Sequence, residues 1–283
     1  MSWGTLVAAE ALAPALDRED VVPVDCRFSL ADVDAGERSW REGHLPGVGY
    51  AHLDRDLSDH GKPAALGRHP LPDAAAFRAL LARLGITPAT QVVAYDAADG
   101  AMAAARFWWL LRLLGHERVA VLDGGMAAWT ACGLPLETAP RVRAPGRYEG
   151  EFDSARIVGT EEVLRRLPQP AGWLVDARAP ERFRGEVEPL DPVAGHVPGA
   201  VNRPIASNLS GGRFKPAEQL ATEFRALLAG RSPTDVVLAC GSGVTACHHA
   251  LAMAHAGLPG ARVYAASWSG WVSDPRRPVA TGD

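Results

Sequence analysis

Short apolar runs alternate with helix-like segments along the chain. The runs at 173–176 (WLVD) and 235–239 (DVVLA) are almost wholly apolar, which is typical of parallel strands buried on both faces. Residues 217–229 and 246–256 have the composition and the spacing of helices. This alternation predicts an α/β fold with a mainly parallel sheet and helices on both of its faces. Ligands of such sheets bind at the carboxyl ends of the strands, so the loop after residue 239 is the first candidate site.

The two halves of the chain carry matching blocks in the same order. The first block is VVPVDCRF in the first half and GWLVDARA in the second, and the second block is GHLPGVGYAHL and GHVPGAVNRPI. The four pairs of blocks are 21–28 with 172–179, 43–53 with 195–205, 92–116 with 236–260, and 119–129 with 261–271. Their nearly constant spacing indicates one duplicated domain rather than a solenoid of short repeats.

A polar segment separates the two copies. Residues 138–152 (TAPRVRAPGRYEGEF) are rich in proline, arginine and glycine and lack apolar periodicity, as linkers do. The chain has 283 residues, which is long enough for two domains. We therefore predict a first domain at 1–137, a linker at 138–154 and a second domain at 155–283.

Composition and charge narrow the class of protein. Hydrophobic residues make up 47% and charged residues 22% of the chain, as in globular proteins. The net charge of -4 provides no basic field for nucleic acid or anionic lipid. Arg106 and Arg112 interrupt the longest apolar stretches, and the first twenty residues lack the basic region of a secretory signal. We expect a cytoplasmic protein with neither a nucleic-acid nor a membrane partner.

The loop at the end of the 235–239 strand differs between the two copies. It reads Cys-Gly-Ser-Gly-Val-Thr (240–245) in the second copy, whereas the first copy has Asp96 at the position of Cys240. Gly241 and Gly243 permit a tight curl of the backbone around the sulfur, and the inward N–H groups then form an anion-binding nest at the start of the next helix. Such a setting stabilises a thiolate, so we predict that Cys240 is a nucleophile.

The other three cysteines have simpler interpretations. Cys132 and Cys247 fall within helical patterns, and Cys26 occupies a position that Ala177 fills in the other copy, so all three are expected to be packing residues. The sequence contains no CxxC pair, so we do not expect a zinc site. We expect the thiols to be reduced rather than joined in disulfides. His44 and His196 lie in the same motif of both copies, which indicates a structural role.

These motifs resemble those of a known family. The duplicated layout, the first copy without a thiol, and C-G-S-G-V-T-A-C at 240–247 are similar to the two-domain rhodaneses, and most of all to the 3-mercaptopyruvate sulfurtransferases. GHLPG, ARFWW, LDGG, RFRG and GHVPG extend the resemblance over nearly the whole chain. The resemblance implies two tandem rhodanese-like domains of α/β fold, of which the second is catalytic. It also implies that Cys240 takes up a sulfane sulfur as a persulfide, without a metal or an organic cofactor.

The resemblance also implies roles for other residues. Arg182, in Arg-Phe-Arg-Gly, matches an arginine that binds the carboxylate or sulfonate of the donor, which a guanidinium fork suits. Ser242 matches a loop serine that acts with an aspartate and a histidine of the first domain, and local alignment assigns these to Asp56 and His69. A series of this kind relays a proton. The loop residues that would hold the donor anion with Arg182 are Gly241, Gly243, Val244 and Thr245.

The choice of donor stays open at this point. Rhodaneses that use thiosulfate usually carry C-R-K-G-V-T, whereas Gly241 and Ser242 are neutral here, which favours mercaptopyruvate. However, Leu190 stands about where the mercaptopyruvate enzymes place a second arginine after Glu-Pro, which leaves thiosulfate:cyanide sulfurtransferase as the alternative. The expected partners are a small anionic sulfur donor and, as acceptor, a thiol, a thioredoxin-like protein or cyanide.

Two other classes of protein fit the sequence less well. Phosphatases of this fold use a Cys-x5-Arg loop, but the sixth residue after Cys240 is Ala246, so the main clamp for a phosphoryl group is missing. A non-catalytic module that binds sulfide or another protein would not need Cys240 in a complete loop. We therefore predict a sulfurtransferase.

Overall fold

The chain folds into two compact units. The computed structural model describes residues 2–98, 103–139, 141 and 143–283, so residues 140 and 142 of the expected linker lie outside the described residues. The first unit comprises Met1–Asp59, Leu71–Asp153 and Gly211–Phe214, and the second comprises His60–Pro70, Ser154–Ser210 and Lys215–Asp283. The main division thus falls after Asp153, but the two units exchange short segments that the expected boundaries do not include.

The first unit is built on a parallel sheet of five strands. The strand order is β1 (Leu6–Val7), β5 (Val119–Leu122), β4 (Gln91–Tyr95), β2 (Val21–Asp25) and β3 (Gly49–Tyr50), and every neighbouring pair is parallel. The helices are α1 (Ala9–Leu12), η1 (Ala13–Ala15), α2 (Ala35–Glu42), α3 (Leu53–Asp56), α4 (Ala74–Arg83), α5 (Ala103–Leu113) and α6 (Gly125–Ala131), and the short strand β10 (Arg213–Phe214) also belongs to this unit.

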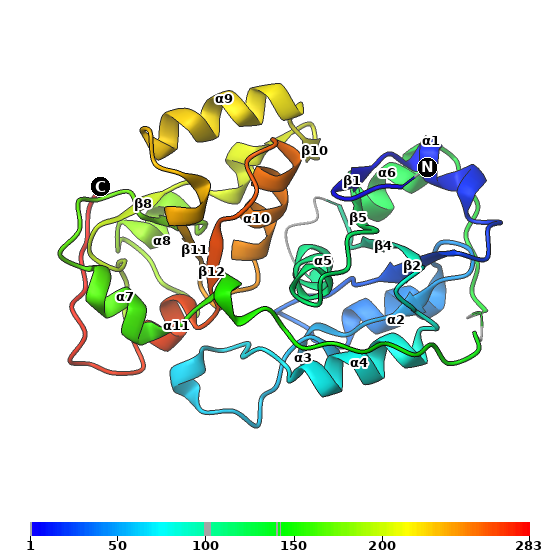
Figure 1. Ribbon diagram of the computed structural model, residues 1–283, viewed down its shortest axis with the longest axis horizontal. Helices are drawn as coiled ribbons and strands as arrows, with labels where there is room; N and C mark the ends of the chain where they lie inside the picture. Colours follow the sequence, from blue (N-terminus) through cyan, green and yellow to red (C-terminus); the bar gives the residue numbers. More distant parts are fainter. Residues whose placement is uncertain (1, 99–102, 140, 142) are drawn as a thin grey trace. The chain divides into compact units, whose positions relative to one another are not determined.

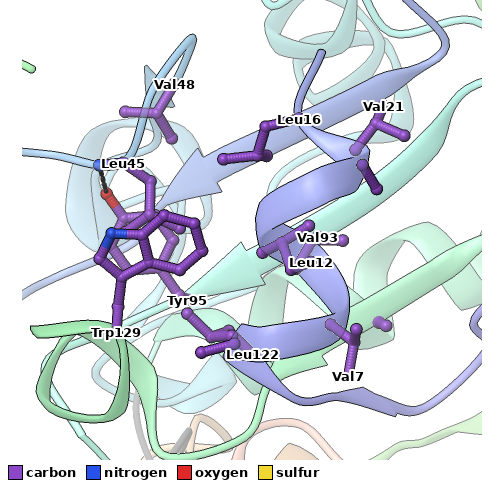
Figure 2. Close-up of a cluster of buried hydrophobic side chains, with 13 residues drawn as sticks. Val7, Leu12, Leu16, Val21, Leu45, Val48, Val93, Tyr95, Leu122 and Trp129 are labelled. Carbon is purple, nitrogen blue, oxygen red and sulfur yellow. Dashed lines mark hydrogen bonds between the residues drawn. The ribbon is translucent and has the colours of Figure 1, made fainter. Parts of the chain in front are cut away.

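Helices cover both faces of this sheet. On one face, Leu12 of α1 and Trp129 of α6 pack on Val93 and Leu122 of the sheet (Figure 2). Tyr95 belongs to the same cluster, and its hydroxyl oxygen accepts a hydrogen bond from the Leu45 N–H. Helix α5 packs on β4 and β5 and is buried on nearly every side, which explains its apolar sequence.

The second unit repeats the architecture of the first. Its sheet runs β6 (Ile157–Val158), β12 (Arg262–Tyr264), β11 (Val237–Ala239), β7 (Leu174–Asp176) and β8 (Ala200–Asn202), again with every neighbouring pair parallel. The other elements of this unit are η2 (Ala64–Leu66), η3 (Ser154–Arg156), α7 (Thr160–Arg166), α8 (Pro180–Phe183), η4 (Ile205–Asn208), β9 (Leu209–Ser210), α9 (Ala217–Leu228), η5 (Pro233–Asp235), α10 (Ala246–His255) and α11 (Ser267–Trp271).

Helices again lie on both faces of the sheet. Val163 of α7 and Trp268 and Trp271 of α11 join the apolar cluster on one face, with Tyr264 from the sheet. On the other face α10 packs on β11 and β12, and α9 lies against α10 (yellow and orange in Figure 1). The predicted α/β fold with two parallel sheets is therefore confirmed. The described helices are all too short or too polar to traverse a lipid bilayer.

Segment 60–70 packs within the second unit although it lies in the first half of the sequence. Its helix η2 contacts α11 (Figure 1). Gly67 makes this approach possible: its φ is 93°, and a Cβ atom there would lie 2.5 Å from the carbonyl oxygen of Ala266. The second unit therefore includes residues 68 and 69, which sequence order assigns to the first domain.

Candidate active site

Cys240 lies directly after β11, at the carboxyl end of the sheet, and the residue is 1% exposed. Its sulfur accepts a hydrogen bond from the Gly243 N–H, with an Sγ–N distance of 3.1 Å. The loop then enters α10, whose first turn adds positive electrostatic potential. A sulfur that accepts a backbone N–H at the start of a helix is placed to carry negative charge.

The two glycines of the loop serve different purposes. Gly243 has φ of 79°, and a Cβ atom there would lie 2.2 Å from the carbonyl oxygen of Ala265, so only glycine fits. Gly241 does not adopt a left-handed conformation, so the expected need for special backbone angles applies to Gly243 alone. A Cβ at residue 241 would instead lie 3.4 Å from Nη2 of Arg68 and 3.5 Å from Nη2 of Arg182. Gly241 therefore keeps open the space beside two guanidinium groups.

The start of α11 fixes the backbone of the loop. Ser267 Oγ accepts the Cys240 N–H at 3.1 Å and donates to the Tyr264 carbonyl at 2.8 Å. The N–H groups of Trp268 and Ser269 donate to the carbonyl oxygens of Cys240 and Gly241 at 3.0 and 2.8 Å. Ser267 itself has φ of 51°, a strained conformation for a residue with a Cβ. No motif in the sequence predicts this role of Ser267.

Ser242 and His69 lie together in the second unit. The Nδ1 atom of His69 and the Oγ atom of Ser242 are 2.8 Å apart, and the two residues are 4% and 6% exposed. Either atom is the donor, depending on which ring nitrogen of His69 carries the proton. The pair can pass a proton in either direction beside the Cys240 loop.

Asp56 belongs to the first unit. It is the last residue of α3, where Oδ2 accepts the His52 N–H at 2.8 Å and Oδ1 accepts from Nη2 of Arg83 at 2.6 Å. These contacts serve the local structure of α3. The link from Asp56 to Ser242 therefore remains a prediction from local alignment.

Arg182 lies in α8 among buried acidic groups. Its Nε and Nη2 atoms donate to Glu188 at 3.1 and 2.6 Å, and Nη2 lies 3.4 Å from Asp191 Oδ2. Arg178 also pairs with Glu188, at 3.3 Å. Burial acts to raise the pKa of Glu188, but hydrogen bonds from Arg182 and Leu190 and the nearby guanidinium charges outweigh it and leave that pKa below its usual value.

Arg68 also lies beside the Cys240 loop, a position that no motif in the sequence predicts. Its Nη1 atom donates to Asp191 Oδ1 at 2.6 Å, and the Asp191 side chain is 3% exposed. Burial raises the pKa of Asp191 although Arg68 and Arg182 lie next to it. The aliphatic Leu190 is 45% exposed and contributes only its carbonyl oxygen to Arg68, at 3.4 Å. The sequence around Arg68 contains no pattern that distinguishes it from the other arginines of the chain.

Val244 and Thr245 complete the loop. Val244 is 3% exposed, and Thr245 is the N-cap residue of α10. Both residues thus lie at the start of the helix that follows Cys240, where their carbonyl oxygens accept the N–H groups of Cys247 and His248.

The other cysteines have packing roles, as their positions predict. Burial raises the pKa of Cys26 well above its usual value, and a hydrogen bond to Glu10 is the main cause of a raised pKa at Cys132. The thiol of Cys247 donates to the Gly243 carbonyl at 3.3 Å.

The two equivalent histidines are buried in matching positions. Nδ1 of His44 bonds to the Trp40 carbonyl at 2.7 Å, and Nδ1 of His196 bonds to the Phe183 carbonyl at 2.8 Å. His44 also forms an isolated β-bridge with Glu137, and His196 forms one with Ala280. These contacts are structural in both copies.

The comparisons with known proteins place this fold and this loop in one family. The model of the rhodanese-like domain matches residues 8–132 and 160–274. The chain therefore belongs to the rhodanese-like family, with two such domains in tandem.

Full-length relatives within the family are named as sulfurtransferases. A probable 3-mercaptopyruvate sulfurtransferase of Pseudomonas aeruginosa is 49% identical over 100% of both chains. A putative thiosulfate sulfurtransferase of Mycobacterium tuberculosis is 40% identical over 98% of this chain and 97% of its own. Among solved structures, SseA of Escherichia coli, described as a 3-mercaptopyruvate sulfotransferase, is 30% identical with a TM-score of 0.81, and the match covers 95% of this chain and 99% of SseA.

Proposed function

We propose that this protein is a 3-mercaptopyruvate sulfurtransferase. The observation that carries the proposal is the Cys240 sulfur, which accepts the Gly243 N–H at the carboxyl end of β11. The full-length relatives named for this activity support mercaptopyruvate as the donor.

The reaction starts with attack of the Cys240 thiolate on the sulfur of mercaptopyruvate. A sulfur–sulfur bond forms, and the bond between that sulfur and the methylene carbon breaks with its electron pair on carbon. The leaving group is the enolate of pyruvate, and Cys240 becomes a persulfide that still carries the donor's proton. That proton passes to the enolate carbon and yields pyruvate. Ser242 and His69 form a hydrogen-bonded pair suited to this transfer.

The remaining residues bind the donor or support the site. We assign donor binding to the backbone of Gly241, Gly243, Val244 and Thr245 and to Arg182. The Gly243 N–H donates to the sulfur, and Arg182 faces Gly241. Both carboxylate oxygens of Asp56 are bonded within its own unit, so we assign Asp56 to the relay from local alignment alone.

The second half-reaction passes the outer sulfur to a nucleophile. We propose a thiol, a thioredoxin-like protein or cyanide as the acceptor, and neither nucleic acid nor a membrane as a partner. We also propose a cytoplasmic location, because the mechanism needs Cys240 as a thiol and a reducing compartment keeps it so.

A persulfide measurement tests the chemistry. After treatment with mercaptopyruvate, mass spectrometry of the peptide that contains 240–247 is expected to show one added sulfur atom. The Cys240→Ser variant should fold and should carry no added sulfur, because a hydroxyl group cannot form a persulfide. Sulfur found on Cys26 or Cys132 instead would contradict the assignment.

The second candidate donor is thiosulfate, which the relative from Mycobacterium tuberculosis favours. Steady-state kinetics with both donors decide between the two. We expect the wild type to have the higher kcat/KM for mercaptopyruvate, because Gly241 and Ser242 add no cations for a dianion. Replacement of this pair by arginine and lysine should shift the ratio toward thiosulfate by at least about tenfold. A preference for thiosulfate would overturn the donor but leave the Cys240 persulfide in place.

A further inference from the structure

Arg68 and Arg182 approach the catalytic loop at the same point. A Cβ atom at residue 241 would lie 3.4 Å from Nη2 of Arg68, and 3.5 and 3.7 Å from Nη2 and Nη1 of Arg182. Gly241 follows the nucleophile directly, so both guanidinium groups lie beside the path of a bound donor. Both arginines belong to the second unit.

Arg182 alone cannot form a bidentate contact with a carboxylate. A guanidinium group has five N–H bonds. In Arg182, the Nε–H and one Nη2–H are directed to Glu188, and Nη2 also lies 3.4 Å from Asp191. Nη1 is the nitrogen left for a ligand, so a donor carboxylate needs a second cation for its other oxygen.

Arg68 is held in position to be that second cation. Its backbone N–H donates to Ser269 Oγ at 2.9 Å, and its Nη1 atom donates to Asp191 at 2.6 Å. Among the described residues, none provides a hydrogen-bond acceptor for its buried Nε atom. Its Nη2 atom points toward Gly241. Asp191 contacts both arginines, so it spaces the two guanidinium groups and balances part of their repulsion.

We infer that Arg68 and Arg182 form a paired carboxylate site, in which each guanidinium binds one oxygen of an α-keto acid donor, and that Asp191 positions the pair. The inference rests on the proposed function for the identity of the donor. It assigns specificity for a carboxylate to segment 60–70, outside the loop that carries the nucleophile.

Kinetics of Arg68→Ala with mercaptopyruvate test the inference. The loss of one charge-assisted hydrogen bond is expected to raise KM by about 10- to 100-fold while kcat changes by less than about threefold. Arg68→Lys should recover part of the loss, because it restores the charge without the planar group. Arg225→Ala, which removes an exposed arginine from α9, is the matched control and should keep the wild-type KM.

A donor without a carboxylate distinguishes a role of Arg68 in carboxylate binding from a role in the structure of the loop. Mercaptoacetone has the same thiol and ketone as mercaptopyruvate but no charge, so Arg68→Ala should leave its kcat/KM within about twofold of the wild type. An equal loss with both donors would mean that Arg68 only supports the loop, and an unchanged KM for mercaptopyruvate would remove Arg68 from the site. Either result overturns the inference.

A binding experiment keeps the inference separate from the proposed function. Absence of a mercaptopyruvate-dependent persulfide on wild-type Cys240 would refute the proposed function. Calorimetry with pyruvate on Cys240→Ser, with and without Arg68→Ala, measures the paired site without turnover. We expect pyruvate to bind at least about tenfold more weakly to the double variant, and equal affinities would overturn the inference.

Discussion

At the scale of single residues, Arg182 has a structural role in addition to the role in donor binding that we propose for it. It faces Gly241 and is also the closest cation to Glu188, at 2.6 Å. We expect Arg182→Ala to raise the KM for mercaptopyruvate by one to two orders of magnitude, which corresponds to about 1.5–3 kcal/mol. Arg182→Lys should reverse only part of this rise in KM, because an ammonium group cannot bond Glu188 and the donor at once with the fixed geometry of a guanidinium group. Initial rates over a range of mercaptopyruvate concentrations give the KM of each variant.

The structural role of Arg182 needs its own measurement. Glu188 would keep Arg178 as a partner in the alanine variant, so urea unfolding should show a loss of only about 1–3 kcal/mol. An unchanged KM together with a loss of stability would reduce Arg182 to its structural role.

The sequence predicted some site residues and missed others for a physical reason. The loop of Cys240 and Gly243 can be predicted because its cysteine, its glycines and the following helix are adjacent in the chain. Arg68 and Ser267 act through contacts with residues far away in sequence, such as Asp191 for Arg68 and Cys240 for Ser267. No local pattern distinguishes them from other arginines and serines.

At the scale of elements, the turn between β11 and α10 depends on Gly243. Alanine at this position would have to keep φ at 79° and place its Cβ 2.2 Å from the Ala265 carbonyl oxygen. The left-handed conformation alone costs about 1–2 kcal/mol, and the clash adds to it. We therefore expect Gly243→Ala to lower the thermal midpoint clearly and to abolish persulfide formation, as followed by calorimetry and mass spectrometry.

Substitution of Gly257 separates the cost of the left-handed conformation from the cost of the steric clash. Gly257 follows α10 with φ of 72°, but no described atom lies within 4 Å of its Cβ position. Gly257→Ala should therefore show only the conformational cost and full transferase activity. Equal losses in the two variants would mean that the clash with Ala265 is unimportant.

The predicted elements agree closely with the observed ones, and the exception is informative. Residues 217–229 and 246–256 were expected as helices and correspond to α9 and α10. Segment 60–70 (HGKPAALGRHP) has no apolar periodicity, so the pattern gave no prediction of where it packs. Its position depends on the close approach of Gly67 to Ala266, which is a long-range contact.

At the scale of the whole molecule, ion pairs of the second unit make stability depend on pH. Hydrogen bonds from Arg203 and Lys215 lower the pKa of Glu223 from 4.5 to about 2. Between these values the unfolded chain binds more protons than the folded one, so this contribution is present above pH 4.5 and is lost as the pH falls toward 2.

Urea midpoints at several pH values test this contribution. We expect Glu223→Gln to be less stable than the wild type near neutral pH, and the difference to shrink as the pH falls through this window. Exchange of the exposed Glu218 for glutamine, on the same helix, is the matched control. A difference that is independent of pH would assign the effect to packing rather than to charge.

The exchange of segment 60–70 makes the two halves of the duplicated gene interdependent. A fragment that starts at Ser154 would carry Cys240, Ser242 and Arg182 but would lack Arg68 and His69. On the proposed mechanism the first copy therefore cannot be deleted, because it encodes residues that belong to the second unit and contribute to the site. On this mechanism, transfer depends on residues from both copies, although only the second copy has a cysteine in the loop after its central strand.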